Sequence, residues 1–356
     1  MPFALPLRRC VLLWTMVLLA SGPARLAADL VWTPEAGWKL EGGVISGLTG
    51  EEGRNALALM NKARAAEDKH HYWSALGTYK KVTKRYPNSA YSPEALYRTG
   101  YIRLARRQYT KAFQAFQAIV IRYPNTSKFN QVIGEQYRIA SAVLDGARGR
   151  GFLGLPGFKH RESSIMLFEQ LLVSAPYSEY APLALMSIAK AHQMFGNAED
   201  AIDALDRMIN TYPKSLLTPD AYLRLAQAHA SLVEGPGYDQ TSTKESITYF
   251  EDFVILYPGD PNIATAEKGL ADMKQVLAES KIRIADFYFK HRKNYKAARV
   301  FYNEAITDYP DSTVATRART QLVKVDAMLA AQEKAAANAP PPKPPPAPKK
   351  KWFLFF

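Results

Sequence analysis

Histidines, cysteine and glycine-rich segments are the places where this 356-residue chain could hold catalytic or metal-binding chemistry. Cys10 is the only cysteine, and residues 149–157, although glycine-rich, lack the lysine and hydroxyl pair of a phosphate-binding loop. Neither an HExxH zinc motif nor a GxSxG nucleophile motif occurs. The histidines fall in no metal-ligand spacing: His70, His71, His160, His192, His229 and His291. We therefore expect a protein that is not an enzyme and uses no metal or cofactor.

A tyrosine–proline pair is what the sequence repeats instead. The segment Tyr86-Pro87-Asn88-Ser89 recurs with small changes near prolines 124, 213 and 310, and weaker copies lie at prolines 176 and 258. Successive prolines are therefore 37, 52, 37, 45 and 52 residues apart. A period in the thirties, with some units lengthened, is typical of a helical solenoid.

Each pair follows a segment with apolar residues at helical spacing, and proline should end that helix because the residue before it is excluded from helical geometry. Ser92-Pro93-Glu94 and Thr218-Pro219-Asp220 offer a hydroxyl cap and an acid for the next helix. Small residues such as Gly100 and Ala112 would let paired helices approach closely. The predicted fold class is all-α: a tetratricopeptide-repeat superhelical solenoid of antiparallel helix pairs, with five to six pairs over residues 55–338.

Two insertions interrupt the period. Residues 146–160 place Phe152, Leu153 and Phe158 on a glycine-rich basic loop, so either the loop folds back on the solenoid or a partner covers it. The second insertion, near 233–244, indicates a long turn. Further helices are expected over 263–291, uninterrupted, and from about 313 to 337 as the cap of the stack.

The first helix of each unit lines the concave face of such a solenoid, and aromatic residues there lie among basic ones. This combination suits an extended peptide that carries acidic groups or a C-terminal carboxylate. Tyr97 and Met186 could equally pack between helices. The groove candidates are Arg64, Tyr97, Tyr101, Tyr137, Met186, Lys190 and Arg224.

The N-terminal segment has the layout of a secretory signal peptide. Residues 1–28 combine Arg8 and Arg9 near the start, an apolar run of about ten residues and a small-residue exit. The apolar run is shorter than the roughly 20 residues that span a bilayer. Residues 29–54 are expected to form a mostly irregular extension. The formal net charge of +13 favours anionic lipid or an acidic partner surface over nucleic acid, which a secreted chain rarely meets.

The tail, residues 339–356, joins a proline-rich spacer to lysines and large apolar residues. The spacer should be extended polyproline. We expect the end of the tail to act as an interfacial membrane peg, with docking into a protein groove as the alternative. The membrane-contact candidates are Lys349, Lys350, Lys351, Trp352, Phe353, Phe355 and Phe356.

Over residues 55 to 330 the chain resembles the YfiO (BamD) family of outer-membrane assembly lipoproteins. The resemblance rests on the secretory start, the units that close in Tyr-Pro-x-Ser, and the insertion around Phe152 that runs into SSIMLFEQLLVSAPYSEYAPLA. The most similar stretch is SKIRIADFYFKHRKNYKAARVFYNEAITDYPDS, residues 280–312.

This resemblance implies a periplasmic scaffold for β-barrel insertion. Its partners would be the periplasmic domains of a BamA-type insertase, other assembly subunits and unfolded β-barrel proteins. The membrane that the C-terminal tail contacts would be the inner leaflet of the outer membrane. The groove near Arg64 and Tyr97 would receive the client, and residues 263–330 would bind the insertase. Cys10 precedes the apolar stretch and cannot serve as the family's lipid site, so a periplasmic adaptor in cell division or peptidoglycan maintenance is the alternative.

Overall fold

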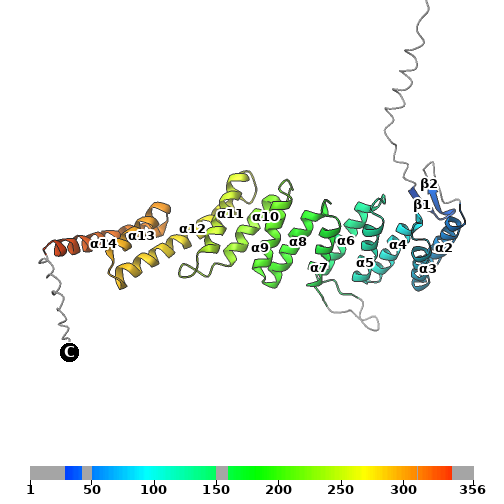
Figure 1. The fold of residues 1–356 in the computed structure, drawn as a ribbon, viewed down its shortest axis with the longest axis horizontal. Helices are drawn as coiled ribbons and strands as arrows, with labels where there is room; N and C mark the ends of the chain where they lie inside the picture. The colour runs from blue at the N-terminus through cyan, green and yellow to red at the C-terminus, as the bar shows by residue number, and fades with distance from the viewer. Residues whose placement is uncertain (1–28, 42–49, 150–158, 311, 339–356) are drawn as a thin grey trace, which may run out of the picture. The chain divides into compact units, whose positions relative to one another are not determined.

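The protein is described by a computed structural model that covers residues 29–41, 50–149, 159–310 and 312–338 (Figure 1). It divides into two compact units, residues 1–195 and 196–356. In each unit, helices that follow one another along the chain pack as antiparallel neighbours, so the expected all-α fold of tetratricopeptide-type helix pairs is confirmed. The expected signal peptide, the loop residues Phe152, Leu153 and Phe158, and the tail from 339 to 356 lie outside the described residues.

The first unit begins with a two-stranded antiparallel hairpin, β1 (Asp29–Thr33) and β2 (Gly37–Glu41), where an irregular extension was expected. Trp38 is buried on α2, and its backbone N–H donates to Asn61 Oδ1 at 3.0 Å. The helices of this unit are α2 (Glu51–Asp68), α3 (Tyr72–Arg85), α4 (Tyr91–Ala105), α5 (Tyr109–Arg122), α6 (Phe129–Leu144), α7 (Ser163–Ser174) and α8 (Tyr180–Phe195).

The second unit ends in longer helices. Its elements are α9 (Ala198–Thr211), α10 (Thr218–Ser231), α11 (Thr241–Leu256), α12 (Ile263–Asp286), the π-helix η2 (Phe287–His291), α13 (Tyr295–Asp308) and α14 (Thr313–Ala337). The helix expected over 263–291 reaches its predicted end, but its last turn is π-helical, so it is not uninterrupted. The helix expected from about 313 to 337 is α14.

The tyrosine–proline pairs end helices as predicted. Tyr86 follows α3 with φ −130° and ψ 56°, outside helical geometry, as the proline after it requires. Ser92 and Thr218 were expected to cap the helices that follow the tyrosine–proline pairs, but their hydroxyl groups do not do so. Ser92 Oγ instead donates to the carbonyl of Tyr86 at 2.7 Å, and Thr218 Oγ1 donates to that of Tyr212 at 3.0 Å. Each hydroxyl thus ties the start of one helix to the end of the helix before it.

Gly100 is a position where two helices pack closely against each other. A β-carbon there would lie 2.6 Å from ring carbons of Phe116, a fully buried residue of α5. Glycine is therefore required by the packing of α4 on α5, as the small-residue pattern predicted.

The variant Gly100→Ala should lower the free energy of unfolding by about 1–3 kcal/mol, because the added methyl overpacks a filled core. Gly77→Ala is the matched control. It lies within α3 with open space around its α-carbon, so it should raise stability by up to about 1 kcal/mol through helix propensity. Urea denaturation followed by circular dichroism measures both, and equal effects of the two variants would contradict the packing argument.

Candidate functional site

The first helices of the pairs in the N-terminal unit, α2, α4 and α6, carry a continuous chain of polar and aromatic contacts. Its first link joins α2 to α4. Arg98 holds Glu67 through two nitrogens, with Nε 3.2 Å from Oε2. The hydroxyl of Tyr79, from α3, donates to the same Oε2 at 2.8 Å. Burial raises the pKa of Glu67, and the hydrogen bond from Tyr79 opposes that shift.

Arg64 belongs to this link and is covered by the hairpin. Its guanidinium lies 4.2 Å from the centroid of the Trp32 ring of β1 and forms ion pairs with Asp68 at 3.1 Å and Glu67 at 3.6 Å. The side chain is 17% exposed. Arg64 is therefore near the expected face, but its charge is already paired, and a peptide carboxylate would have to compete with two carboxylates of the protein.

The second link joins α4 to the start of α6. Lys128 Nζ lies 2.5 Å from Glu94 Oε2, and the Glu94 side chain is only 6% exposed. Burial raises the pKa of Glu94, while the charge of Lys128 lowers it. The same ammonium group lies 4.6 Å from the centroid of the Tyr97 ring, so one lysine makes both an ion pair and a cation–π contact.

The third link runs along α4 to α6 through hydroxyl groups. Tyr97 donates to the Tyr101 hydroxyl at 3.3 Å, and Tyr101 donates to Glu135 Oε1 at 2.8 Å. Both rings pack edge-on against Phe116. Burial raises the pKa values of both tyrosines, which therefore stay neutral donors at physiological pH.

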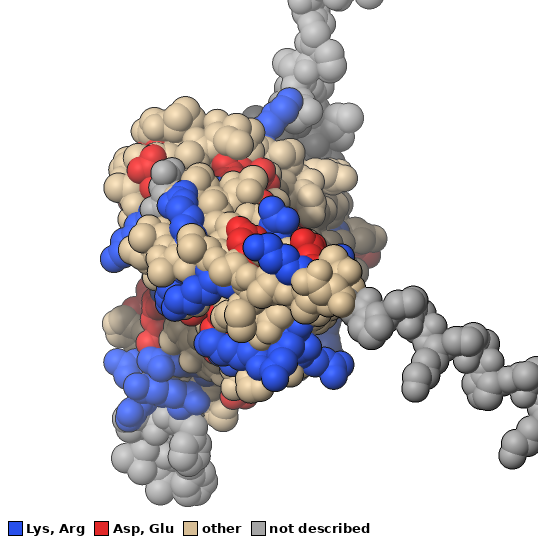
Figure 2. Space-filling model, turned by 90° about the vertical axis from the view of Figure 1, so that its left-hand side faces the viewer, with Lys and Arg blue, Asp and Glu red and all other residues tan. Residues whose placement is uncertain are grey.

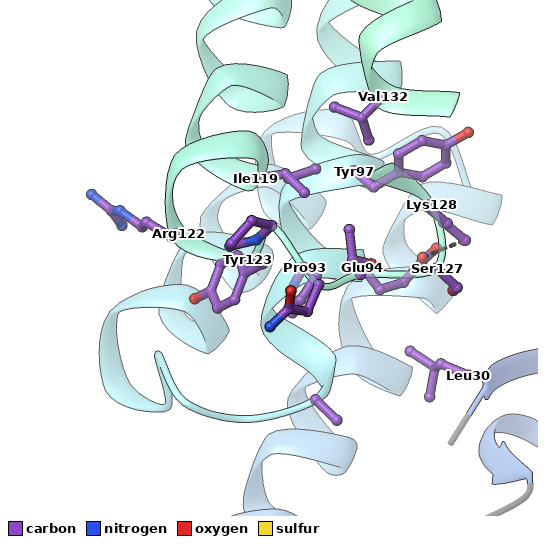
Figure 3. Close-up of a pocket in the computed structure, with 14 residues that line it drawn as sticks. Leu30, Pro93, Glu94, Tyr97, Ile119, Arg122, Tyr123, Ser127, Lys128 and Val132 are labelled. Atoms are coloured by element: carbon purple, nitrogen blue, oxygen red, sulfur yellow. Dashed lines mark hydrogen bonds and ion pairs between the residues drawn. The ribbon is translucent and has the colours of Figure 1, made fainter. Parts of the chain in front are cut away.

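Two hollows open along this face. One, of about 440 Å³, is lined by residues from Leu30 of the hairpin to Val132 of α6, and Glu94 and Lys128 are joined by their ion pair within its wall (Figure 3). The other, of about 370 Å³, has Arg64 and Tyr101 in its wall. The structure thus places three expected groove residues, Arg64, Tyr97 and Tyr101, around neighbouring hollows. Tyr97 itself is 6% exposed, so it is largely a packing residue.

The other groove candidates are placed less closely together. Tyr137 packs between Phe168 and Tyr180, and its hydroxyl lies 3.3 Å from Ser187 Oγ. Met186, on α8, is half-buried, and Lys190 on the same helix is exposed. Arg224 belongs to the second unit and pairs with Asp220 at 2.8 Å, four residues earlier on α10.

The sequence reading missed the acidic members of the site: Glu67, Glu94 and Glu135. A signal for them was present, because the contacting partners are separated by about one repeat. Glu67 and Arg98 are 31 residues apart, Glu94 and Lys128 are 34 apart, and Tyr101 and Glu135 are 34 apart. A search for complementary residues at the repeat period would therefore have found these pairs.

Within the described ranges, no three His, Cys, Asp or Glu side chains are grouped so that they could hold a metal ion. A search of those same residues also finds no helix that combines the length and the apolar character needed to cross a bilayer.

Two family profiles match the chain. The profile of YfiO, described as outer membrane lipoprotein, matches residues 159–339, and a tetratricopeptide-repeat profile matches residues 54–126. Among solved structures, a tetratricopeptide repeat protein from Parabacteroides merdae is 15% identical with a TM-score of 0.30, covering 76% of this chain and 98% of its own.

Curated relatives share the same printed name, outer membrane protein assembly factor BamD. The protein of Rickettsia prowazekii is 26% identical over 47% of this chain and 66% of its own length. That of Xylella fastidiosa strain 9a5c is 23% identical over 41% of this chain and 53% of its own, and that of Caulobacter vibrioides is 24% identical over 47% and 55%. The chain thus spans less than two thirds of the length of each of these relatives.

The variant Lys128→Met should destabilise the N-terminal unit by about 3 kcal/mol at neutral pH, because it leaves the buried Glu94 carboxylate unpaired. Adding Glu94→Gln to it should restore most of that loss. Since burial already raises the pKa of Glu94 in the folded chain, its folded state binds a proton more readily than its unfolded state. The loss in Lys128→Met should therefore shrink as the pH falls through that raised pKa. Urea denaturation at several pH values measures this, and a loss independent of pH would contradict the assignment.

Proposed function

The chain belongs to the YfiO family of outer membrane lipoproteins, and from this we propose that it is a scaffold subunit of outer-membrane β-barrel assembly. In this role it would act at the periplasmic face of the outer membrane, without catalysis of its own, and would bind a BamA-type insertase and unfolded barrel clients. The observation that carries the proposal is the YfiO match over residues 159–339, together with relatives that are named as assembly factors.

The client would bind the N-terminal unit. The hollows around Arg64, Tyr97 and Tyr101 combine hydroxyl donors and aromatic edges with cations held by carboxylates. An incoming peptide carboxylate could exchange with Glu67 or Asp68 on Arg64 at little net electrostatic cost, because one carboxylate would replace another. Such exchange favours weak and reversible contacts, which suit a protein that must release its client.

The insertase would bind α12 to α14 in the second unit. These helices are joined by ion pairs between neighbours, including Lys281 with Glu304 at 2.6 Å and Arg299 with Asp326 at 3.2 Å. Large apolar side chains nevertheless remain exposed on this part of the chain: Phe287, Val300, Val323 and Met328. Several exposed apolar side chains on one part of a chain favour contact with a protein partner.

Membrane solubilisation in mild detergent, followed by affinity purification through a tag placed after Asp29, tests the assembly role. We expect a large β-barrel protein with periplasmic repeats to co-purify. Recovery of division or cell-wall proteins alone would instead support the adaptor alternative. Neither result would change the assignment of the fold.

The double variant Val300→Glu/Val323→Glu should weaken recovery of the insertase at least tenfold, because charge would enter the proposed contact. Leu216→Glu is the control: Leu216 is 97% exposed in the same unit but precedes α10. Both variants should keep the helical circular dichroism of the parent. Equal recovery with the two variants would place the insertase contact elsewhere.

A further inference from the structure

The charge of the N-terminal unit is unevenly distributed. Between residues 69 and 134 the sequence contains twelve Lys or Arg residues and a single acid, Glu94. That acid is buried and held by Lys128 on the first-helix face. The helices α3 and α5 contain no acid at all. The face made by these second helices therefore carries cations with no counter-charge of its own, within a chain of formal net charge +13. Figure 2 faces the α14 end of the chain, where Lys and Arg side chains also gather in clusters.

A hollow of about 460 Å³ lies on this second-helix face, separate from the candidate site described above. Side chains from α3, α4 and α5 form its wall. Its cations are Lys80, Arg103, Lys111 and Arg122. No Asp or Glu lines it, and none of the four cations has an ion pair in the described part of the chain. Arg122 also borders the 440 Å³ hollow, but its side chain points away from the other residues there (Figure 3).

The wall of the hollow is amphiphilic. Its polar part includes Thr83, Thr99 and Gln114, and its apolar part consists of Leu76, Leu96, Ala115 and Ala118. Arg103 is half-buried there, and burial lowers its pKa from the ordinary value. An anion in the hollow would supply the charge compensation that the protein itself does not provide.

Two large apolar side chains extend the same helix faces into solvent. Trp73 is 73% exposed and precedes Leu76 and Lys80 at helical spacing on α3. Ile121 is 68% exposed and follows Ala118 by three residues on α5. Cations beside an exposed tryptophan and an exposed aliphatic side chain are typical of a protein surface that lies on a membrane.

We propose that this basic hollow, with Trp73 and Ile121 at its margin, binds the phosphate headgroups of an anionic phospholipid membrane. The cations would contact the phosphates, and the two apolar side chains would enter the headgroup region. An acidic protein segment would satisfy the cations equally well, but it would leave Trp73 and Ile121 exposed. The family is described as outer membrane lipoprotein, so a membrane surface is available. This inference does not depend on the assembly role.

Vesicle co-sedimentation tests the proposal with the purified protein, using phosphatidylglycerol–phosphatidylcholine vesicles and pure phosphatidylcholine vesicles. The double variant Lys80→Gln/Lys111→Gln removes two exposed cations of the hollow. The matched control, Lys62→Gln/Lys69→Gln, removes two exposed lysines of α2 and its C-terminal cap, and neither lines the hollow. Both variants change the net charge equally, so they differ only in where the charge is lost.

We expect the parent to bind the anionic vesicles and not the neutral ones. The Lys80→Gln/Lys111→Gln variant should bind at least tenfold more weakly, since each cation near such a surface contributes substantially. The control should change binding less than twofold. Equal losses in the two variants would reduce the effect to net charge and overturn the proposal, as would unchanged binding of the first variant.

Competition separates the possible sources of the anion. Millimolar inorganic phosphate should not displace the protein from anionic vesicles, and neither should a polyglutamate peptide at equal charge. Displacement by phosphate would indicate a free-phosphate site, and displacement by the peptide would indicate an acidic protein partner; either result overturns the lipid assignment.

A fluorescence measurement keeps the proposal testable without charge changes. In a Cys10→Ser background, Gln114→Cys carries an environment-sensitive label beside the hollow, and Ala58→Cys, at an exposed and uncharged position, carries the same label on α2. We expect a blue shift on anionic vesicles only for the label at position 114. Shifts of equal size at both positions, or none at 114, would contradict a bound membrane at this face.

Discussion

The carbonyl group of the residue between each second helix and its proline is the constraint on which the repeats depend. This residue is a tyrosine except after α7, where it is Ala175. At Tyr86 it accepts a hydrogen bond from the Ser89 N–H at 3.0 Å and another from Ser92 Oγ at 2.7 Å. The same pattern recurs at Tyr212. Because the next residue is proline, the helix cannot continue, and these bonds set the direction in which the next helix begins. Within each unit, neighbouring helix pairs therefore stack in a fixed register. This stacking builds the core that no pair could form alone.

This register decides where charges meet. Residues one repeat apart lie side by side on the first helices, so Glu67 meets Arg98 and Glu94 meets Lys128. The two buried acids in the described part of the N-terminal unit both have partners one repeat away: Glu94 pairs with Lys128, and Glu135 accepts from Tyr101. The second helices α3 and α5 receive no acid and stay uniformly basic. One periodic packing rule therefore gives the unit a neutralised aromatic face and a separate cationic face.

The two faces differ in what they can bind. In the proposed function, the first-helix face would exchange one hydrogen-bonded or ion-paired partner for another, which favours reversible contacts with polypeptide. The second-helix face has uncompensated charge and exposed apolar side chains, which favour an anionic amphiphilic surface. In the second unit, the long helices α12 and α14 are held by ion pairs at their margins and leave apolar side chains in solvent.

The sequence alone determined the helix ends, the repeat period, the small residue at Gly100 and the α14 helix, because each depends on local chain geometry or on spacing along one chain. It did not reveal the hairpin of β1 and β2, in which Trp32 lies opposite Trp38, since this hairpin is stabilised by packing on α2. Nor did it show that Arg64 is paired or that Tyr97 is buried. Those properties depend on side chains brought together from different helices, and a carboxylate such as Glu94 looks like any surface acid until the register of the repeats places Lys128 beside it. Tertiary structure alone decided which charges are neutralised and which remain free to bind.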